Sequence, residues 1–119
     1  MSPNSVEVTL SVQPTEFTMA QRSSVVLTLT ATNKGRRTVD PGLARARLLV
    51  DGRESKAWQL AVGNGRRAPE WSALPPGESV SMSWSALGPA LFPRVGEFRL
   101  ELALPTQVLP TIRVTADPD

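Results

Sequence analysis

Hydrophobic and polar residues alternate along most of this chain, with the two-residue period typical of β-strands. In the run at 6–12, for example, valine and leucine occupy every second position. Such runs predict about seven strands, at residues 6–12, 25–32, 44–50, 55–62, 79–86, 97–104 and 108–116. In the weaker run at 55–62, Trp58, Leu60 and Val62 are expected to share one face. The last run is expected at a sheet edge, because Pro110 cannot donate to a ladder.

Turn-forming residues separate these runs, which fits strands joined by tight connections. Asn33-Lys34-Gly35 and Asp51-Gly52 are turn signals, because Asn, Asp and Gly tolerate positive φ. Leu74-Pro75-Pro76-Gly77-Glu78 predicts a rigid turn before the run at 79–86. A helix over 42–49 is less favoured than a strand. We therefore predict an all-β fold, a single immunoglobulin-like antiparallel sandwich over 1–119, with a small barrel as the alternative. Its core is expected at about 5–116, with frayed termini.

Several of these segments resemble bacterial immunoglobulin-like modules. The resemblance lies in Thr32-Asn33-Lys34-Gly35, in the turn at 74–79 and in Val95-Gly96-Glu97-Phe98-Arg99-Leu100. Within that group the chain is similar to the intracellular proteinase inhibitor family first described in bacilli, through its length, its lack of cysteine and the stretch Asp51-Gly52-Arg53-Glu54-Ser55-Lys56-Ala57-Trp58. The resemblance implies a bacterial binding module and admits proteinase inhibition, although no reactive-site motif is matched.

Composition narrows the chemistry, because the 119 residues include no cysteine and no histidine. There can be no disulfide, thiolate nucleophile, imidazole base or His/Cys metal site. We therefore expect no enzymatic activity, no cofactor and no metal.

Charge adds little: 13 Lys+Arg stand against 11 Asp+Glu. Acidic residues interspersed among the basic ones argue against nucleic acid as a partner. No apolar run is long enough to span a membrane. The start of the chain lacks a signal-peptide pattern, which predicts a cytoplasmic location for a full-length chain and an extracellular one for an excised domain.

The candidate interaction residues lie mainly in predicted loops. Arg36-Arg37 and Arg66-Arg67 are basic doublets beside glycine-containing turns, and with Arg22 or Arg94 they could form an anion-binding cluster, although solvated loops are the simpler interpretation. Trp71 lies in a segment without a clear period. It either caps the end of the core or forms a surface anchor.

Three functions follow from these residues. The first is a non-catalytic module that binds another protein through inter-strand loops or an edge strand. The second is a proteinase inhibitor that presents Arg66 or Arg67 in the loop 63–68, which begins Gly63-Asn64-Gly65. The third is carbohydrate binding through Trp71. The strands at 25–32 and 79–86 also predict a polar face of Thr and Ser hydroxyls, more often only the solvated side of a sheet.

Overall fold

The chain folds into two β-sheets. A computed structural model describes residues 6–63, 69–85, 87–105 and 107–119. One sheet has the order β1-β3-β6, formed by Val6–Gln13 (β1), Val26–Asn33 (β3) and Ser79–Trp84 (β6). The other has the order β2-β8-β7-β4-β5, formed by Glu16–Thr18 (β2), Arg47–Val50 (β4), Arg53–Glu54 (β5), Gly96–Ala103 (β7) and Ile112–Asp117 (β8). All neighbours are antiparallel except β2 and β8, which run parallel. The predicted β-rich fold is confirmed.

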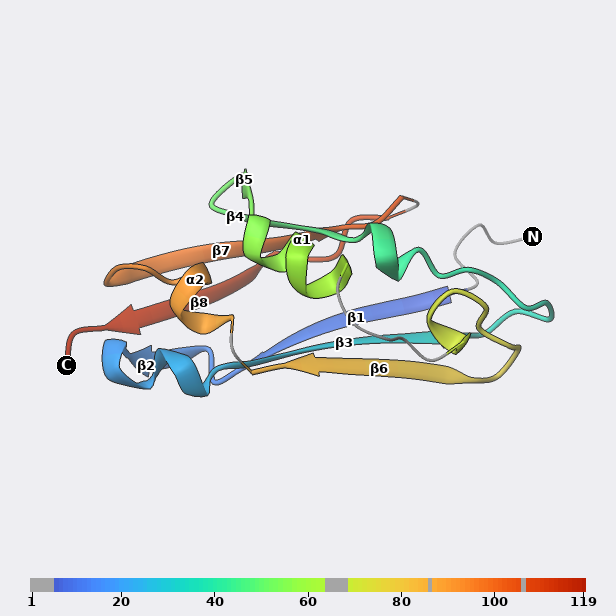
Figure 1. The fold of residues 1–119 in the computed structure, drawn as a ribbon, viewed down its shortest axis with the longest axis horizontal. Coiled ribbons are helices and arrows are strands. Elements are labelled where there is room, and N and C mark those ends of the chain that lie inside the picture. Colours follow the sequence, from blue (N-terminus) through green and yellow to red (C-terminus); the bar gives the residue numbers. More distant parts are fainter. Residues whose placement is uncertain (1–5, 64–68, 86, 106) are drawn as a thin grey trace.

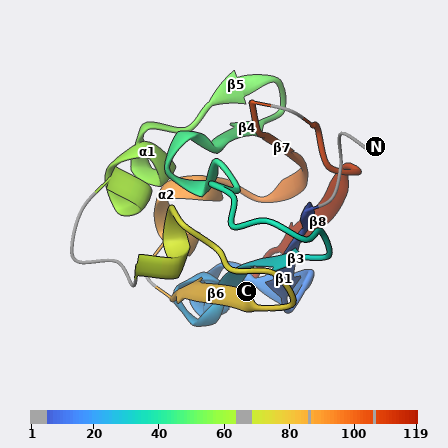
Figure 2. The same cartoon turned by 90° about the vertical axis from the view of Figure 1, so that its right-hand side faces the viewer.

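The core lies between the two sheets, which form separate layers (Figure 2). Leu27 and Leu29 of β3 and Leu100 of β7 are fully buried, as is Val114 of β8. Along 25–32 every second residue from Val25 to Ala31 is buried, whereas Val26 and the threonines are half-buried, as the alternation predicts. The hydrophobic pattern therefore decides which face of each long strand packs inward.

Helical segments accompany the two layers, and α1 and α2 lie along one open side (Figures 1 and 2). These segments are α1 (Lys56–Gly63) and α2 (Gly88–Leu91), with the short 3-10 helices η1 (Met19–Ser24), η2 (Leu43–Arg45) and η3 (Pro69–Trp71). The start of α2 lies against η1 so closely that a Cβ at Gly88 would be 1.8 Å from the carbonyl oxygen of Arg22. Arg22 also donates to the carbonyl oxygen of Phe92, just after α2.

The prediction of a strand over 55–62 is wrong, because this segment forms helix α1. Trp58 and Val62, four residues apart, are buried, whereas Leu60 is 65% exposed. This is the spacing of one helical face, not of a strand. Ser55 caps the helix by accepting a hydrogen bond from the backbone N–H of Trp58, and the Trp58 ring donates to the carbonyl oxygen of Ala46.

Two other strand predictions need correction. Residues 43–45 form η2 after Gly42, whose φ of 79° turns the chain, so Ala44 is exposed instead of facing inward. The last strand is not at an edge: β8 lies between β2 and β7, and Pro110 precedes it. Near the end of the chain, Ala116 is fully buried and Asp119 accepts a hydrogen bond from the backbone N–H of Ala20.

Asn33 forms its turn by a different means from the one expected. Among the described residues other than glycine, Asp51 has a positive φ and Asn33 does not. Asn33 is instead fully buried, and its Nδ2 donates to the carbonyl oxygens of Arg37 and Leu74 while its Oδ1 accepts from the N–H of Gly35. One side chain thus joins the end of β3 to the turn that precedes β6.

Candidate functional site

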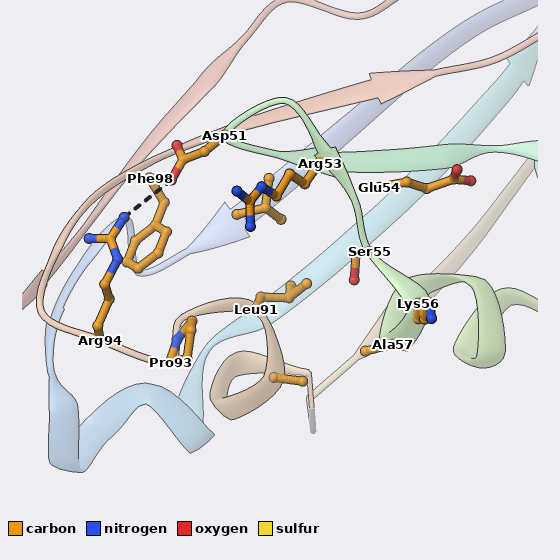
Figure 3. Close-up of a pocket in the computed structure, with 12 residues that line it drawn as sticks. Asp51, Arg53, Glu54, Ser55, Lys56, Ala57, Leu91, Pro93, Arg94 and Phe98 are labelled. Atoms are coloured by element: carbon orange, nitrogen blue, oxygen red, sulfur yellow. Dashed lines mark ion pairs between the residues drawn. The ribbon is translucent and has the colours of Figure 1, made fainter.

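A groove of about 720 Å³ lies beside the β4–β5 hairpin (Figure 3). One wall is the hairpin and the first turn of α1, and the other is the segment that runs from α2 into β7. Its floor is apolar and its rim carries charges. The lining comprises Val50, Asp51, Arg53, Glu54, Ser55, Lys56, Ala57, Ala90, Leu91, Pro93, Arg94 and Phe98.

The turn Asp51-Gly52 shapes the first wall. Both residues have positive φ, 51° and 83°, which is the geometry of a two-residue type I′ hairpin. Asp51 is further held by β7, because its backbone and its Oδ1 both bond the backbone of Arg99. The predicted turn is confirmed, and it directs the chain back along β4 so that Arg53 and Ser55 face the groove (Figure 3).

Arg94 forms the opposite end of the groove. Its guanidinium lies 3.6 Å from the Asp51 carboxylate and 4.8 Å above the centre of the Phe98 ring. Phe98 itself is buried, so the ring presents one face to Arg94 and the rest to the core. The cation–π contact and the ion pair fix the guanidinium at the groove mouth.

Glu54 is neutralised from outside the groove. Arg47 donates two hydrogen bonds to its carboxylate, at 3.0 and 3.1 Å, and Gln59 donates a third. These bonds from Arg47 and then Gln59 lower the pKa of Glu54 below its usual range. Glu54 therefore stays ionised near neutral pH, but its charge is matched by Arg47 and not by a cation of the groove.

Arg53 and Lys56 are the cations that remain. Both are exposed, and within the described part of the chain neither has an ion pair. Lys56 is also the first residue of α1, where the helix dipole makes a positive charge unfavourable unless an anion is nearby. The groove thus presents two uncompensated cations above Val50 and Ala57, which are half-buried. An anion with an adjoining apolar group fits this combination.

The residues that the sequence suggested for binding are not brought together here. Arg36 and Arg37 are exposed in the loop after β3, at the opposite end of the molecule from the start of β7, which follows Arg94 (Figure 1). The cluster of Arg36-Arg37 with Arg22 or Arg94 is therefore not formed. Asn64, Arg66 and Arg67 lie outside the described residues.

Trp71 belongs to the core. It is only 4% exposed, and its ring lies 6.4 Å from that of Trp84, which in turn lies 4.9 Å from Trp58. This burial agrees with the first of the two alternatives for Trp71, in which it caps the end of the core. A buried ring has no free face on which a sugar could stack.

The predicted hydroxyl face is present between β3 and β6. Three Thr–Ser pairs across these strands are joined by hydrogen bonds between their hydroxyl oxygens at 2.8, 2.9 and 2.8 Å, namely Thr28–Ser83, Thr30–Ser81 and Thr32–Ser79. Each pair uses only one of its two O–H donors, and the remaining donors and acceptors are exposed to water, as expected for the solvated side of a sheet.

Sequence reasoning missed the groove, although one signal for it was available. Arg53 and Lys56 both follow the Asp51-Gly52 turn within a few residues, so two cations at one hairpin could have been expected. The contribution of Arg94 depends on the packing of α2 and β7 and has no local signal.

Within the described residues, no helix is both long enough and apolar enough to cross a membrane.

Comparison with known proteins adds no assignment. No protein-family model matches the chain, and a search of curated proteins finds no significant match.

Proposed function

We propose that the chain is an immunoglobulin-like module. The strand order β1-β3-β6 against β2-β8-β7-β4-β5 supports this, because the first and third strands pair in one sheet while the last two strands pair in the other. The parallel pairing of short β2 with β8 is explained by a first strand that changes sheets after β1. Six of the seven predicted strands are present, because 55–62 forms helix α1, and the short strands β2 and β5 bring the described total to eight.

Its function is non-catalytic protein binding, and the groove beside the β4–β5 hairpin is the binding site. The observation that carries this proposal is the pair of uncompensated cations, Arg53 and Lys56, above a half-buried apolar floor. The matching ligand is an acidic segment of a partner protein, with a carboxylate at these cations and a neighbouring aliphatic side chain on Val50 and Ala57.

Two features favour an acidic peptide over other anionic partners. Asp51 and Glu54 line the same wall as Arg53 and Lys56, so the groove lacks the concentrated basic patch that the continuous phosphate backbone of a nucleic acid requires. Glu54 is also unsuited to general acid catalysis near neutral pH, because the hydrogen bonds from Arg47 and Gln59 lower its pKa and keep it ionised.

The test is an NMR titration of the ¹⁵N-labelled full chain with two peptide panels. In one panel each short peptide carries Asp or Glu beside Leu or Val. In the other, Asn or Gln replaces the acid. We expect the acidic panel to shift the amide resonances of 50–57 and 94–98, and the neutral panel to leave them in place. Absence of any shift with acidic peptides contradicts the proposal.

A further inference from the structure

Among the described strands, β6 is an edge strand, with η3 in contact with it. It pairs with β3 alone and forms the outer edge of the three-stranded sheet (Figures 1 and 2). Its sequence, Ser-Val-Ser-Met-Ser-Trp, contains neither a charge nor a proline. Natural proteins usually protect such edges with those residues, because a free edge can pair with another strand.

The register fixes which backbone groups of β6 are free. The N–H of Asn33 donates to the carbonyl oxygen of Glu78 at 2.9 Å, so hydrogen-bonded pairs recur from there at every second residue. The residues of β6 that bond β3 are therefore Val80, Met82 and Trp84. The N–H and C=O groups of Ser79, Ser81 and Ser83 point away from β3, toward the open edge.

The other strand edges are shorter, charged or flanked. β2 has only three residues. β5 has only two, and both of them are charged. β1 contains Glu7, and residues 109–112 lie beside it across a cavity of about 250 Å³. Among the described strands, β6 is thus the long edge without protection.

We propose that β6 pairs with β6 of a second copy of this chain, antiparallel about a two-fold axis through Ser81. In that register Ser81 faces the same residue of the second copy, and Ser79 faces Ser83, so every free N–H meets a C=O. The pairing forms about six hydrogen bonds, two for each hydrogen-bonded pair. The uncharged sequence of β6 favours a second copy as the occupant, because no like charges meet when the strand pairs with itself. A strand edge buries less than the roughly 1,000 Å² of a stable interface, so only a weak, reversible dimer is expected.

Both faces of β6 are compatible with this pairing. On the outer face the Thr–Ser hydroxyl pairs continue from one copy into the next. On the inner face, Val80 lies opposite Met82 of the second copy, and both side chains are half-buried in the isolated chain. No like charges meet along the strand, since β6 has none. This interface is separate from the groove, so either can fail without the other.

Sedimentation equilibrium of the full chain tests the dimer. We expect the average mass of the wild type to rise toward that of a dimer as the protein concentration approaches about 1 mM, as for weak interfaces. Ser81→Pro removes the central outward N–H without removing a bond to β3, and is expected to remain monomeric. Ser81→Ala loses the same hydroxyl but keeps the N–H, and is expected to dimerise. A wild type that stays monomeric, or a dimer retained in Ser81→Pro, overturns the proposal.

A charge exchange at Ser81 tests the register even if Ser81→Pro fails to fold. Ser81→Asp and Ser81→Lys each place like charges opposite one another across the axis, which opposes pairing. Each variant alone is expected to be monomeric, and a 1:1 mixture is expected to associate again. If the mixture stays monomeric although the wild type dimerises, the axis does not pass through Ser81 and the proposed register is wrong.

Discussion

At the scale of single residues, Asn33 is the polar side chain on which the fold depends most. It is fully buried, and its amide connects three backbone groups from two separate segments. The resemblance to immunoglobulin-like modules rested partly on an asparagine at this position. The structure supplies a physical reason for that asparagine: only a carboxamide offers two donors and an acceptor in the arrangement required.

Replacing Asn33 with alanine should destabilise the chain strongly. The change leaves the carbonyl oxygens of Arg37 and Leu74 without their donor, and each buried unpaired group costs about 1–3 kcal/mol. We expect a loss of about 2–4 kcal/mol in the free energy of unfolding, measured by urea denaturation. Thr32→Ala is the control, because it removes one exposed hydroxyl pair and should cost at most about 1 kcal/mol. Equal losses in the two variants would contradict this role for Asn33.

Two glutamates should make opposite contributions to the pH dependence of stability. A hydrogen bond to Asp117 and the negative charge of Asp117 raise the pKa of Glu16, whereas the bonds from Arg47 and Gln59 lower the pKa of Glu54. The contribution of Glu16 is therefore present below its ordinary pKa and lost as pH rises through the raised value. That of Glu54 is present above its ordinary pKa and lost as pH falls through the lowered value.

Thermal unfolding of Glu16→Gln and Glu54→Gln measures these contributions. At neutral pH we expect Glu16→Gln to raise Tm, because it removes repulsion from Asp117, and Glu54→Gln to lower Tm, because it weakens the bonds from Arg47. The Glu16→Gln difference should shrink as the pH falls through the raised pKa of Glu16 toward the ordinary glutamate value of about 4.3. The Glu54→Gln difference should persist down to that value and shrink only below it, because the pKa of Glu54 is lowered. Differences of the same sign in the two variants would show that the carboxylates are not held as described.

At the scale of elements, the long strands could be predicted from sequence and the short or helical segments could not. β1, β3, β6 and β7 have enough residues for alternation to be unambiguous. In 55–62, however, Trp58 and Val62 satisfy both a two-residue and a four-residue spacing, and only the exposure of Leu60 distinguishes them. β2 and β5 are too short for any period.

The local sequence pattern also could not predict which distant segments pair with each other. The central place of β8 depends on β2, which lies almost the whole chain away, and the groove depends on Arg94 meeting Asp51. The candidate residues named from the sequence were therefore loop arginines, and the groove cations Arg53 and Lys56 were not among them.

Substitutions in α1 separate the helical from the extended arrangement. Leu60→Glu should change stability by less than about 1 kcal/mol, since that side chain is largely exposed. Val62→Glu should cost at least about 3 kcal/mol, because it buries an unpaired carboxylate. Urea denaturation of both variants provides the measurement. Similar losses for both would indicate that residues 58, 60 and 62 share one buried face, as in a strand.

At the scale of the whole molecule, two layers about a common core hold two distinct surfaces. The groove lies beside the β4–β5 hairpin of one sheet, and the free edge of β6 belongs to the other sheet. No residue of β6 lines the groove, so self-association and binding of an acidic segment are expected to be independent.

The central claim is that Arg53 and Lys56 bind an acidic segment, and the NMR titration of charge-reversed variants tests it most directly. With an acidic peptide that shifts 50–57 in the wild type, we expect Arg53→Glu/Lys56→Glu to weaken the apparent affinity at least about tenfold, since attraction becomes repulsion. Arg36→Glu, an equally exposed arginine at the far end of the molecule, should leave the affinity unchanged. Equal affinity for the double variant and the wild type, or an equal loss in Arg36→Glu, would contradict the claim.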